Sequence, residues 1–197
     1  MNIEKTIVFV GKSGCGKGTQ VKLLMDYFTK KGEKVLLTES GSRFRDLMGG
    51  DGYVSKKVKN TVDNGFFLPD IFPIWTMVDT LIKDMKEDNE IVFLDAVLRS
   101  TGQAKAMEEF MQFLGREKYI VLNIEVSDGW SRDRLLSRGR HDDTEEKINN
   151  RLGDFRKSVV PMLEYMREDS AYSVLDINGE QSIEEVHTEI MNKLGLQ

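Results

Sequence analysis

Short apolar runs recur along the chain, and segments with the spacing of amphipathic helices lie between them. The runs occupy residues 7–10, 35–37, 91–94, 120–126 and 174–177. They are rich in β-branched residues, which is typical of buried strands. Apolar residues recur at helical spacing over 21–28, 104–114 and 183–194. Because helical crossovers join parallel neighbours, this alternation predicts an α/β fold with a five-stranded parallel sheet.

Residues at the ends of the periodic segments agree with these helices. Gly32 follows the first segment, where a glycine ends many helices, and Ser182 with Glu185 forms a capping box before the last. Ligands of such sheets bind beyond the carboxyl ends of the strands. We therefore expect the functional residues in the segments that follow the strands.

Two segments are longer than a simple crossover requires. The first runs from residue 39 to about residue 73 and contains a helical stretch at 55–62, so we expect a small inserted subdomain. The second, residues 137–144, is polar and highly charged. A long helix with apolar residues at Ile148, Leu152, Phe155 and Val159 follows it. We interpret 137–144 as a short mobile flap between two helices.

Composition narrows the classes of function. The length of 197 residues fits one domain, and the net charge of −5 argues against a broad basic surface for nucleic acid. Cys15 is the only cysteine, which excludes an internal disulfide and a cysteine-based zinc cluster. The first apolar run is too short for a signal peptide or a membrane span. We expect a cytoplasmic protein that binds neither membranes nor nucleic acid.

A glycine-rich loop directly follows the first predicted strand and precedes a helix. It reads Gly-Lys-Ser-Gly-Cys-Gly-Lys-Gly-Thr over residues 11–19. Glycines allow backbone N–H groups to turn toward phosphate oxygens, and Lys17 would neutralise the β- and γ-phosphates. Gly18 stands where the general motif has Ser or Thr, with Thr19 one position later. The predicted ATP-binding residues are Gly14, Cys15, Gly16, Lys17, Gly18 and Thr19.

The variant Gly-Lys-Gly-Thr-Gln at residues 16–20 resembles the adenylate kinase family. The resemblance runs from residue 7 to about residue 190. It implies a single three-layer P-loop NTP hydrolase-like domain over 1–197, an NMP-binding insertion at 39–68 and a short lid at 137–144. It also implies transfer of the γ-phosphoryl group of ATP to a nucleoside monophosphate, a Mg²⁺ ion with the ATP, no zinc and a monomeric protein.

The segment after the second strand is similar to the Thr/Ser-Gly-acid-x-x-Arg motif of the family. It reads Ser-Gly-Ser-Arg-Phe-Arg over residues 40–45, with Ser42 in place of the acid. The resemblance implies that Ser40 and Gly41 contact the monophosphate and that Arg45 holds its α-phosphate, a task that suits a guanidinium. Phe66, Phe67 and Leu68 would form the apolar wall for the base, although these side chains could equally belong to an ordinary core.

The third predicted strand ends in Asp95, and Arg99 and Gln103 follow at the family's spacing. Asp95 is placed to orient the water ligands of Mg²⁺ together with Thr19, or alternatively to cap the next helix. The resemblance implies that Arg99 clamps the acceptor phosphate and that Gln103 reads the base, which favours AMP. The family's Gly-Phe-Pro is replaced by Ala-Val-Leu at 96–98, so the geometry of this turn stays open.

Further arginines agree with the resemblance. Arg134, Arg138, Arg140 and Arg151 match positions that surround both phosphate chains in the family. Arg134 and Arg138 would contact ATP, and Arg140 and Arg151 would contact the monophosphate. Gln181 lies in the loop expected against the adenine of ATP. All four arginines, Lys17 and Arg99 are the predicted catalytic residues.

Two alternatives remain open at this point. A UMP/CMP kinase would share the short lid and tolerate Ser40. A nucleotide-binding regulatory protein without turnover stays possible because of the altered turn at 96–98. A P-loop GTPase is disfavoured, since the sequence has no Asn-Lys-x-Asp segment.

Overall fold

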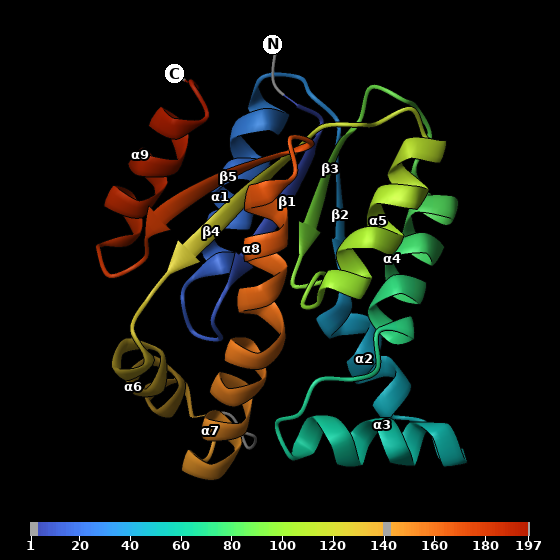
Figure 1. Ribbon diagram of the computed structural model, residues 1–197, viewed down its shortest axis with the longest axis vertical. Helices are drawn as coiled ribbons and strands as arrows, with labels where there is room; N and C mark the ends of the chain where they lie inside the picture. Colours follow the sequence, from blue (N-terminus) through green and yellow to red (C-terminus); the bar gives the residue numbers. More distant parts are fainter. Residues whose placement is uncertain (1–3, 140–142, 197) are drawn as a thin grey trace.

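The computed structural model describes residues 4–139 and 143–196 (Figure 1). The strands are β1 (Thr6–Gly11), β2 (Val35–Glu39), β3 (Ile91–Asp95), β4 (Tyr119–Glu125) and β5 (Tyr172–Asn178). The helices are α1 (Lys17–Lys30), α2 (Ser40–Met48), α3 (Tyr53–Asp63), α4 (Ile71–Asp84), α5 (Thr101–Phe113), α6 (Asp128–Arg138), α7 (Glu145–Asp154), α8 (Val160–Glu168) and α9 (Ile183–Lys193), with a π-helical turn, η1 (Phe155–Val159), between α7 and α8. Each predicted strand and each predicted periodic segment is present.

The strands form one parallel sheet in the order β2-β3-β1-β4-β5, which confirms the predicted α/β class and the five-stranded sheet. β1 lies at its centre, with Val8 beside Leu94 of β3 and beside Val121 of β4. The carboxyl ends of β1, β2 and β3 therefore meet at one edge, where Glu39 pairs in register with Asp95. That edge carries the segments predicted to bind ligand.

Alternating side chains of β1 divide the apolar core between the two faces of the sheet. Ile7 and Phe9 pack with residues of α1 and α9, whereas Val8 and Val10 pack with residues of α4, α5 and α8. The period of two follows from the pleat of a strand buried on both faces. The result is three layers, with helices on both sides of the sheet (Figure 1).

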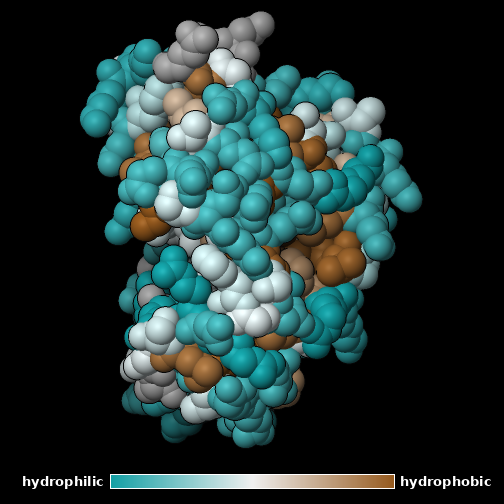
Figure 2. All heavy atoms as spheres, turned by 90° about the vertical axis from the view of Figure 1, so that its left-hand side faces the viewer, coloured by the Kyte–Doolittle hydropathy of each residue, from teal (hydrophilic) through white to brown (hydrophobic). Residues whose placement is uncertain are grey.

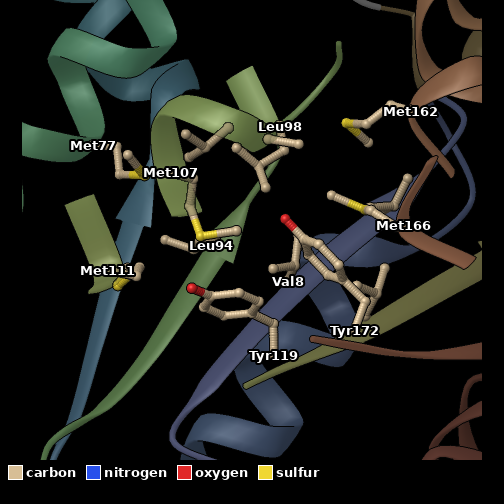
Figure 3. Packing of buried hydrophobic residues seen from close by; sticks show 14 of the residues in the cluster. Val8, Met77, Leu94, Leu98, Met107, Met111, Tyr119, Met162, Met166 and Tyr172 are labelled. Carbon is tan, nitrogen blue, oxygen red and sulfur yellow. The ribbon is translucent and has the colours of Figure 1, made fainter. Parts of the chain in front are cut away.

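Methionines supply much of the packing on the α4, α5 and α8 side (Figure 3). Met77 comes from α4, Met107 and Met111 from α5, and Met162 and Met166 from α8, and all five are fully buried. The flexible thioether side chain fills irregular gaps between helices and sheet.

The predicted helix ends are confirmed. Gly32 has φ 81° after α1, a left-handed conformation that favours glycine. Ser182 accepts a hydrogen bond from the backbone N–H of Glu185, whose side chain accepts one from the Ser182 backbone, so the capping box before α9 is complete.

The segment predicted as an insertion folds into α2, α3 and a turn that leads to α4. Phe44, Val58 and Leu68 form a small apolar cluster within this segment. α4 was not predicted, although its sequence has a helical apolar pattern that follows Pro73. Proline is tolerated there since it lies in the first turn of the helix, where no intrahelical N–H bond is lost. Residues 140–142 of the predicted lid, including Arg140, lie outside the described residues.

The face that carries α9 and α6 is mostly hydrophilic and is interrupted by separate hydrophobic patches (Figure 2). Across residues 4–139 and 143–196, every helix is too short or too polar to cross a bilayer.

Candidate active site

The glycine-rich loop between β1 and α1 has the conformation that its glycines permit. Gly11 has φ 147°, and a Cβ there would lie 2.5 Å from the carbonyl oxygen of Ile124. Gly14 has φ 83°, and a Cβ there would lie 3.2 Å from the carbonyl oxygen of Ser131. Glycine is therefore required where the loop passes β4 and α6. Gly16 caps α1 without a side-chain cap, which leaves the first N–H groups of the helix available to an anion.

Lys17 curls back into this loop. Its Nζ donates to the carbonyl oxygens of Gly11 and Lys12, the latter at 3.1 Å, and lies 3.4 Å from Sγ of Cys15. Cys15 is buried and fills the inside of the loop. The loop thus places one cation beside the N-terminus of α1, an arrangement suited to a phosphate chain.

Four of the predicted arginines line one cavity of about 560 Å³. Arg45 comes from α2, Arg99 from the turn after β3, Arg138 from α6 and Arg151 from α7. The cavity wall also contains Ser13, Gly41, Phe66, Phe67 and Leu68. A cavity with several guanidinium groups and an aromatic wall can bind an anion attached to a flat apolar group.

A smaller cavity of about 100 Å³ joins the two halves of the site. Lys12, Ser13 and Lys17 line it from the loop, and Arg99 and Arg151 line it from the arginine side. The phosphate loop and two of the four arginines therefore face the same small space.

The turn after β3, which the sequence left open, is left-handed at Ala96, with φ 54°. This conformation directs the Ala96 carbonyl oxygen toward two groups: it accepts from Oγ of Ser40 at 3.0 Å and from Nε of Arg99 at 3.2 Å. The Arg99 guanidinium also lies 4.7 Å from the centre of the Phe67 ring. Burial lowers the pKa of Arg99, and the charge of Asp95 opposes that effect. The turn thus fixes Arg99 in the cavity wall.

Asp143 holds two of the cavity arginines. Its carboxylate accepts from Nε and Nη2 of Arg138, both at 2.8 Å, and from Nη1 of Arg151 at 2.9 Å. Its side chain is fully buried. Burial alone would raise the pKa of Asp143, but the hydrogen bonds from Arg138 and then Arg151 together outweigh it and keep the pKa below its usual value.

Asp95 lies where β3 ends, beside Lys17 and Glu39. Burial raises the pKa of Asp95, the charge of Lys17 lowers it and the charge of Glu39 raises it. Thr19 is exposed in the first turn of α1. A carboxylate and a hydroxyl near the phosphate loop are the oxygen donors that Mg²⁺ prefers, so these residues fit that ion. Among the described residues, no group of three or more His, Cys, Asp or Glu side chains could hold a metal.

Apart from the phosphate loop and Asp95, four predicted residues that the structure describes do not line the larger cavity. Ser40 is fully buried, with its hydroxyl bonded to the Ala96 carbonyl oxygen. Arg134 is exposed and stacks 5.6 Å from the Trp130 ring. Gln181 donates to the carbonyl oxygen of Asn178 and to Glu189. Gln103 is buried, with its amide bonded to the backbone of Arg99 and to Asp70.

Two contacts that the sequence did not predict join α6 to the phosphate loop. Lys12 Nζ lies 2.7 Å from Oδ1 of Asp128 and donates to the Val126 carbonyl oxygen at 2.7 Å. Ser131, fully buried, donates through Oγ to the carbonyl oxygen of Ser13 at 2.7 Å. Lys12 and Ser13 were visible in the sequence as the non-glycine residues at the start of the loop. α6, which carries Arg138, is therefore anchored where it leaves β4.

α7 also contacts the turn between α3 and α4. The backbone N–H of Phe67 donates to Oδ2 of Asp154 at 2.8 Å, and Nδ2 of Asn150 donates to the carbonyl oxygen of Asn64 at 3.0 Å. Asp154 lies one helical turn after Arg151, so both project from the same side of α7. That spacing is the only signal in the sequence that could have singled out Asp154.

Comparison with known proteins identifies relatives over nearly the whole chain. The family model described as adenylate kinase matches residues 9–171. Adenylate kinase 1 of Nostoc sp. is 33% identical over 192 residues, which cover 96% of this chain and 98% of that protein. The adenylate kinase of Corynebacterium aurimucosum is 31% identical, with 95% and 98% covered, and that of Oenococcus oeni is 29% identical, with 92% and 94% covered.

Proposed function

The chain belongs to the adenylate kinase family and is a nucleoside monophosphate kinase, and from this premise we propose that its acceptor is AMP, with the reaction ATP + AMP = 2 ADP. The observation that carries the proposal is the convergence of four arginines from four segments on one cavity beside the phosphate loop. The names of the relatives, all adenylate kinases, favour AMP.

In the proposed complex, the phosphates of ATP bind residues 14–19. The N–H groups at the start of α1 and the ammonium of Lys17 bind the β- and γ-phosphates. Asp95 and Thr19 would hold Mg²⁺ through its water ligands, and the ion, when bound, supplies charge neutralisation of the phosphate oxygens. Arg134 and Gln181 join this site only by moving from their present contacts with Trp130, Asn178 and Glu189.

The acceptor occupies the larger cavity. Arg45 and Arg99 bind its α-phosphate, with Ser40 and Gly41 beside it. Phe66, Phe67 and Leu68 cover the base, and Gln103 reads its edge. The segment 39–68 acts as the insertion that encloses the acceptor.

Positioning and charge stabilisation account for most of the catalysis of phosphoryl transfer. Arg138 and Arg151 line the acceptor cavity, and Arg151 also lines the small cavity toward the phosphate loop, while Asp143 holds both guanidinium groups in place. The positive charge of both guanidinium groups stabilises the negative charge of the transferring group. Closure of the lid at 137–144, which carries Arg140, excludes water that would otherwise accept the phosphoryl group.

A UMP/CMP kinase is the alternative within the same enzyme class. The test supplies purified protein with ATP, Mg²⁺ and each of AMP, CMP, UMP, GMP and dTMP, and measures diphosphate formation. We expect the highest kcat/KM with AMP. Diphosphate formation from UMP or CMP but not from AMP would overturn the acceptor assignment.

A further inference from the structure

The amide of Gln103 is held at both ends by groups of opposite character. Its Oε1 accepts from the backbone N–H of Arg99 at 2.6 Å, and its Nε2 donates to Oδ1 of Asp70 at 2.8 Å. A backbone N–H can only donate and a carboxylate can only accept, so the partners determine which way the amide points. A reversed amide would set two donors against each other at Arg99 and two acceptors against each other at Asp70.

Asp70 is itself fixed against the start of α5. Its Oδ2 accepts from Oγ of Ser100 at 2.8 Å, and a Cβ on Gly102 would lie 2.7 Å from that same oxygen. The absence of a side chain at Gly102 therefore lets the carboxylate approach the helix. This contact holds Asp70 in place while it orients Gln103.

The orientation decides what Gln103 can still offer to a ligand. A side-chain amide has two N–H donors and two lone pairs on its oxygen, and the two bonds above use one of each. One donor on Nε2 and one lone pair on Oε1 remain, with their order fixed. Adenine and cytosine present an amino group next to an acceptor ring nitrogen, whereas uracil and guanine present a carbonyl oxygen next to a ring N–H. The two pairs of bases require opposite orders of donor and acceptor on the amide.

We propose that Asp70 is a specificity-determining residue, which locks the Gln103 amide in the one orientation that reads an amino group beside a ring nitrogen. The acceptor site then selects adenine or cytosine monophosphate over uracil or guanine monophosphate. This inference rests on the proposed function, in which Gln103 reads the base.

The position of the amide supports the assignment. Arg99, whose backbone binds Gln103, lines the acceptor cavity, and so does Leu68, two residues before Asp70. Gln103 itself is 2% exposed and does not line the cavity, so a base reaches the amide only after the side chains that cover it move.

The experiment compares wild type with Asp70→Ala and Asp70→Asn. Alanine removes the carboxylate that accepts from Nε2 of Gln103. Asparagine keeps the shape of the side chain, but its amide N–H can donate to the oxygen of a reversed Gln103 amide. Asp84→Asn is the matched control, because Asp84 is an exposed carboxylate at the far end of the same helix, α4. For each protein we measure kcat/KM with AMP, CMP, UMP and GMP, and equilibrium binding of each monophosphate by calorimetry without ATP. Circular dichroism checks folding.

In Asp70→Ala we expect the preference for AMP over UMP to fall at least about tenfold in both kcat/KM and binding, the scale of one charge-assisted hydrogen bond. The preference for CMP over UMP falls with it, and Asp84→Asn keeps both ratios. Should Asp70→Ala fail to fold, the ratios of kcat/KM for AMP over UMP and for CMP over UMP in Asp70→Asn test the role of Asp70. Unchanged ratios in a folded Asp70 variant, or a wild type that prefers UMP or GMP, would overturn the inference. A wild type that prefers CMP to AMP would refute the AMP assignment and leave the role of Asp70 standing.

Discussion

The carbonyl oxygen of Ala96 binds Nε of Arg99 at 3.2 Å, and it is aimed there because Ala96 has a left-handed backbone with φ 54°. Left-handed conformations cost a residue with a Cβ about 1–2 kcal/mol. The same carbonyl oxygen accepts from Ser40, so one unfavourable backbone conformation positions two residues of the acceptor site.

Ala96→Gly is expected to raise the free energy of unfolding by about 0.5–1 kcal/mol, because the strain it relieves exceeds the entropy that glycine gains in the unfolded chain. Kinase activity should be retained, since the carbonyl oxygen stays in place. Urea denaturation measures the change. Ala106→Gly, in the middle of α5, is the control and should lower the free energy of unfolding by about 1 kcal/mol. If Ala96→Gly destabilised the protein as much as Ala106→Gly, the strain at Ala96 would be refuted.

Asp143→Asn is expected to lower the free energy of unfolding at pH 7 by about 3 kcal/mol, because it removes the buried partner of Arg138 and Arg151. The pKa of Asp143 is lowered in the folded state, so its contribution is present above the unfolded pKa of about 3.9 and is lost as the pH falls through the folded pKa. The difference between wild type and variant should therefore be constant near neutral pH and shrink below about pH 4.

Chemical denaturation at pH 7, 5, 4 and 3 follows this difference. Asp133→Asn is the control, since Asp133 is exposed on α6. A gap between wild type and Asp143→Asn that stayed constant down to pH 3 would show that the charge of Asp143 does not stabilise the fold.

The sheet and the phosphate loop could be predicted from the sequence because both depend on local patterns. The continuous apolar run of β1 and the strand-loop-helix order around Lys17 are readable without tertiary contacts. The fold class, the family and the strands were predicted correctly on this basis. α4 was not predicted, although apolar residues recur at helical spacing after Pro73.

Contacts between distant segments could not be predicted from the sequence. Asp70 and Gln103 are 33 residues apart, and Phe67 and Asp154 are 87 apart, so only the packed chain brings each pair together. Ala96 stands where the family's motif has glycine, which marked this turn in the sequence, but the left-handed conformation of the alanine could not be predicted from it. The role assigned to each site residue stays a prediction until the variants are measured.

Lys17→Met is expected to lower kcat by roughly 10²- to 10⁵-fold, the scale of losing a cation that stabilises a transferring phosphoryl group. Arg138→Ala should fall in the same range, since Arg138 lines the acceptor cavity beside the phosphate loop. Steady-state kinetics with ATP and AMP measures both. Lys22→Met, an exposed lysine on the same helix as Lys17, should keep normal turnover. Near-normal turnover of Lys17→Met would show that the phosphate loop is assigned incorrectly.

Asp154→Ala tests whether α7 holds the insertion against the acceptor. The carboxylate of Asp154 binds the N–H of Phe67, and the Phe67 ring lies on the Arg99 guanidinium, so the contact links α7 to the acceptor clamp. We expect KM for the monophosphate to rise about tenfold, the scale of one hydrogen bond to a charged group. KM for ATP should change less than about twofold, because ATP binds the other side of the site. Asp154→Asn is the matched variant, which keeps an acceptor oxygen and should lie between wild type and alanine.

Gly65→Ala perturbs the same interface from the opposite side. Gly65 has φ 80°, and a Cβ there would lie 2.6 Å from the carbonyl oxygen of Lys147 on α7. The methyl group has to push the turn away from α7, so KM for the monophosphate should rise as in Asp154→Ala while KM for ATP stays near its wild-type value. Asp154→Ala removes a hydrogen bond, whereas Gly65→Ala adds bulk. A similar rise of KM for the monophosphate in both variants would show that this rise is caused by separating the turn from α7. If KM for ATP rose in parallel in both variants, the contact would support the whole site rather than closure over the acceptor.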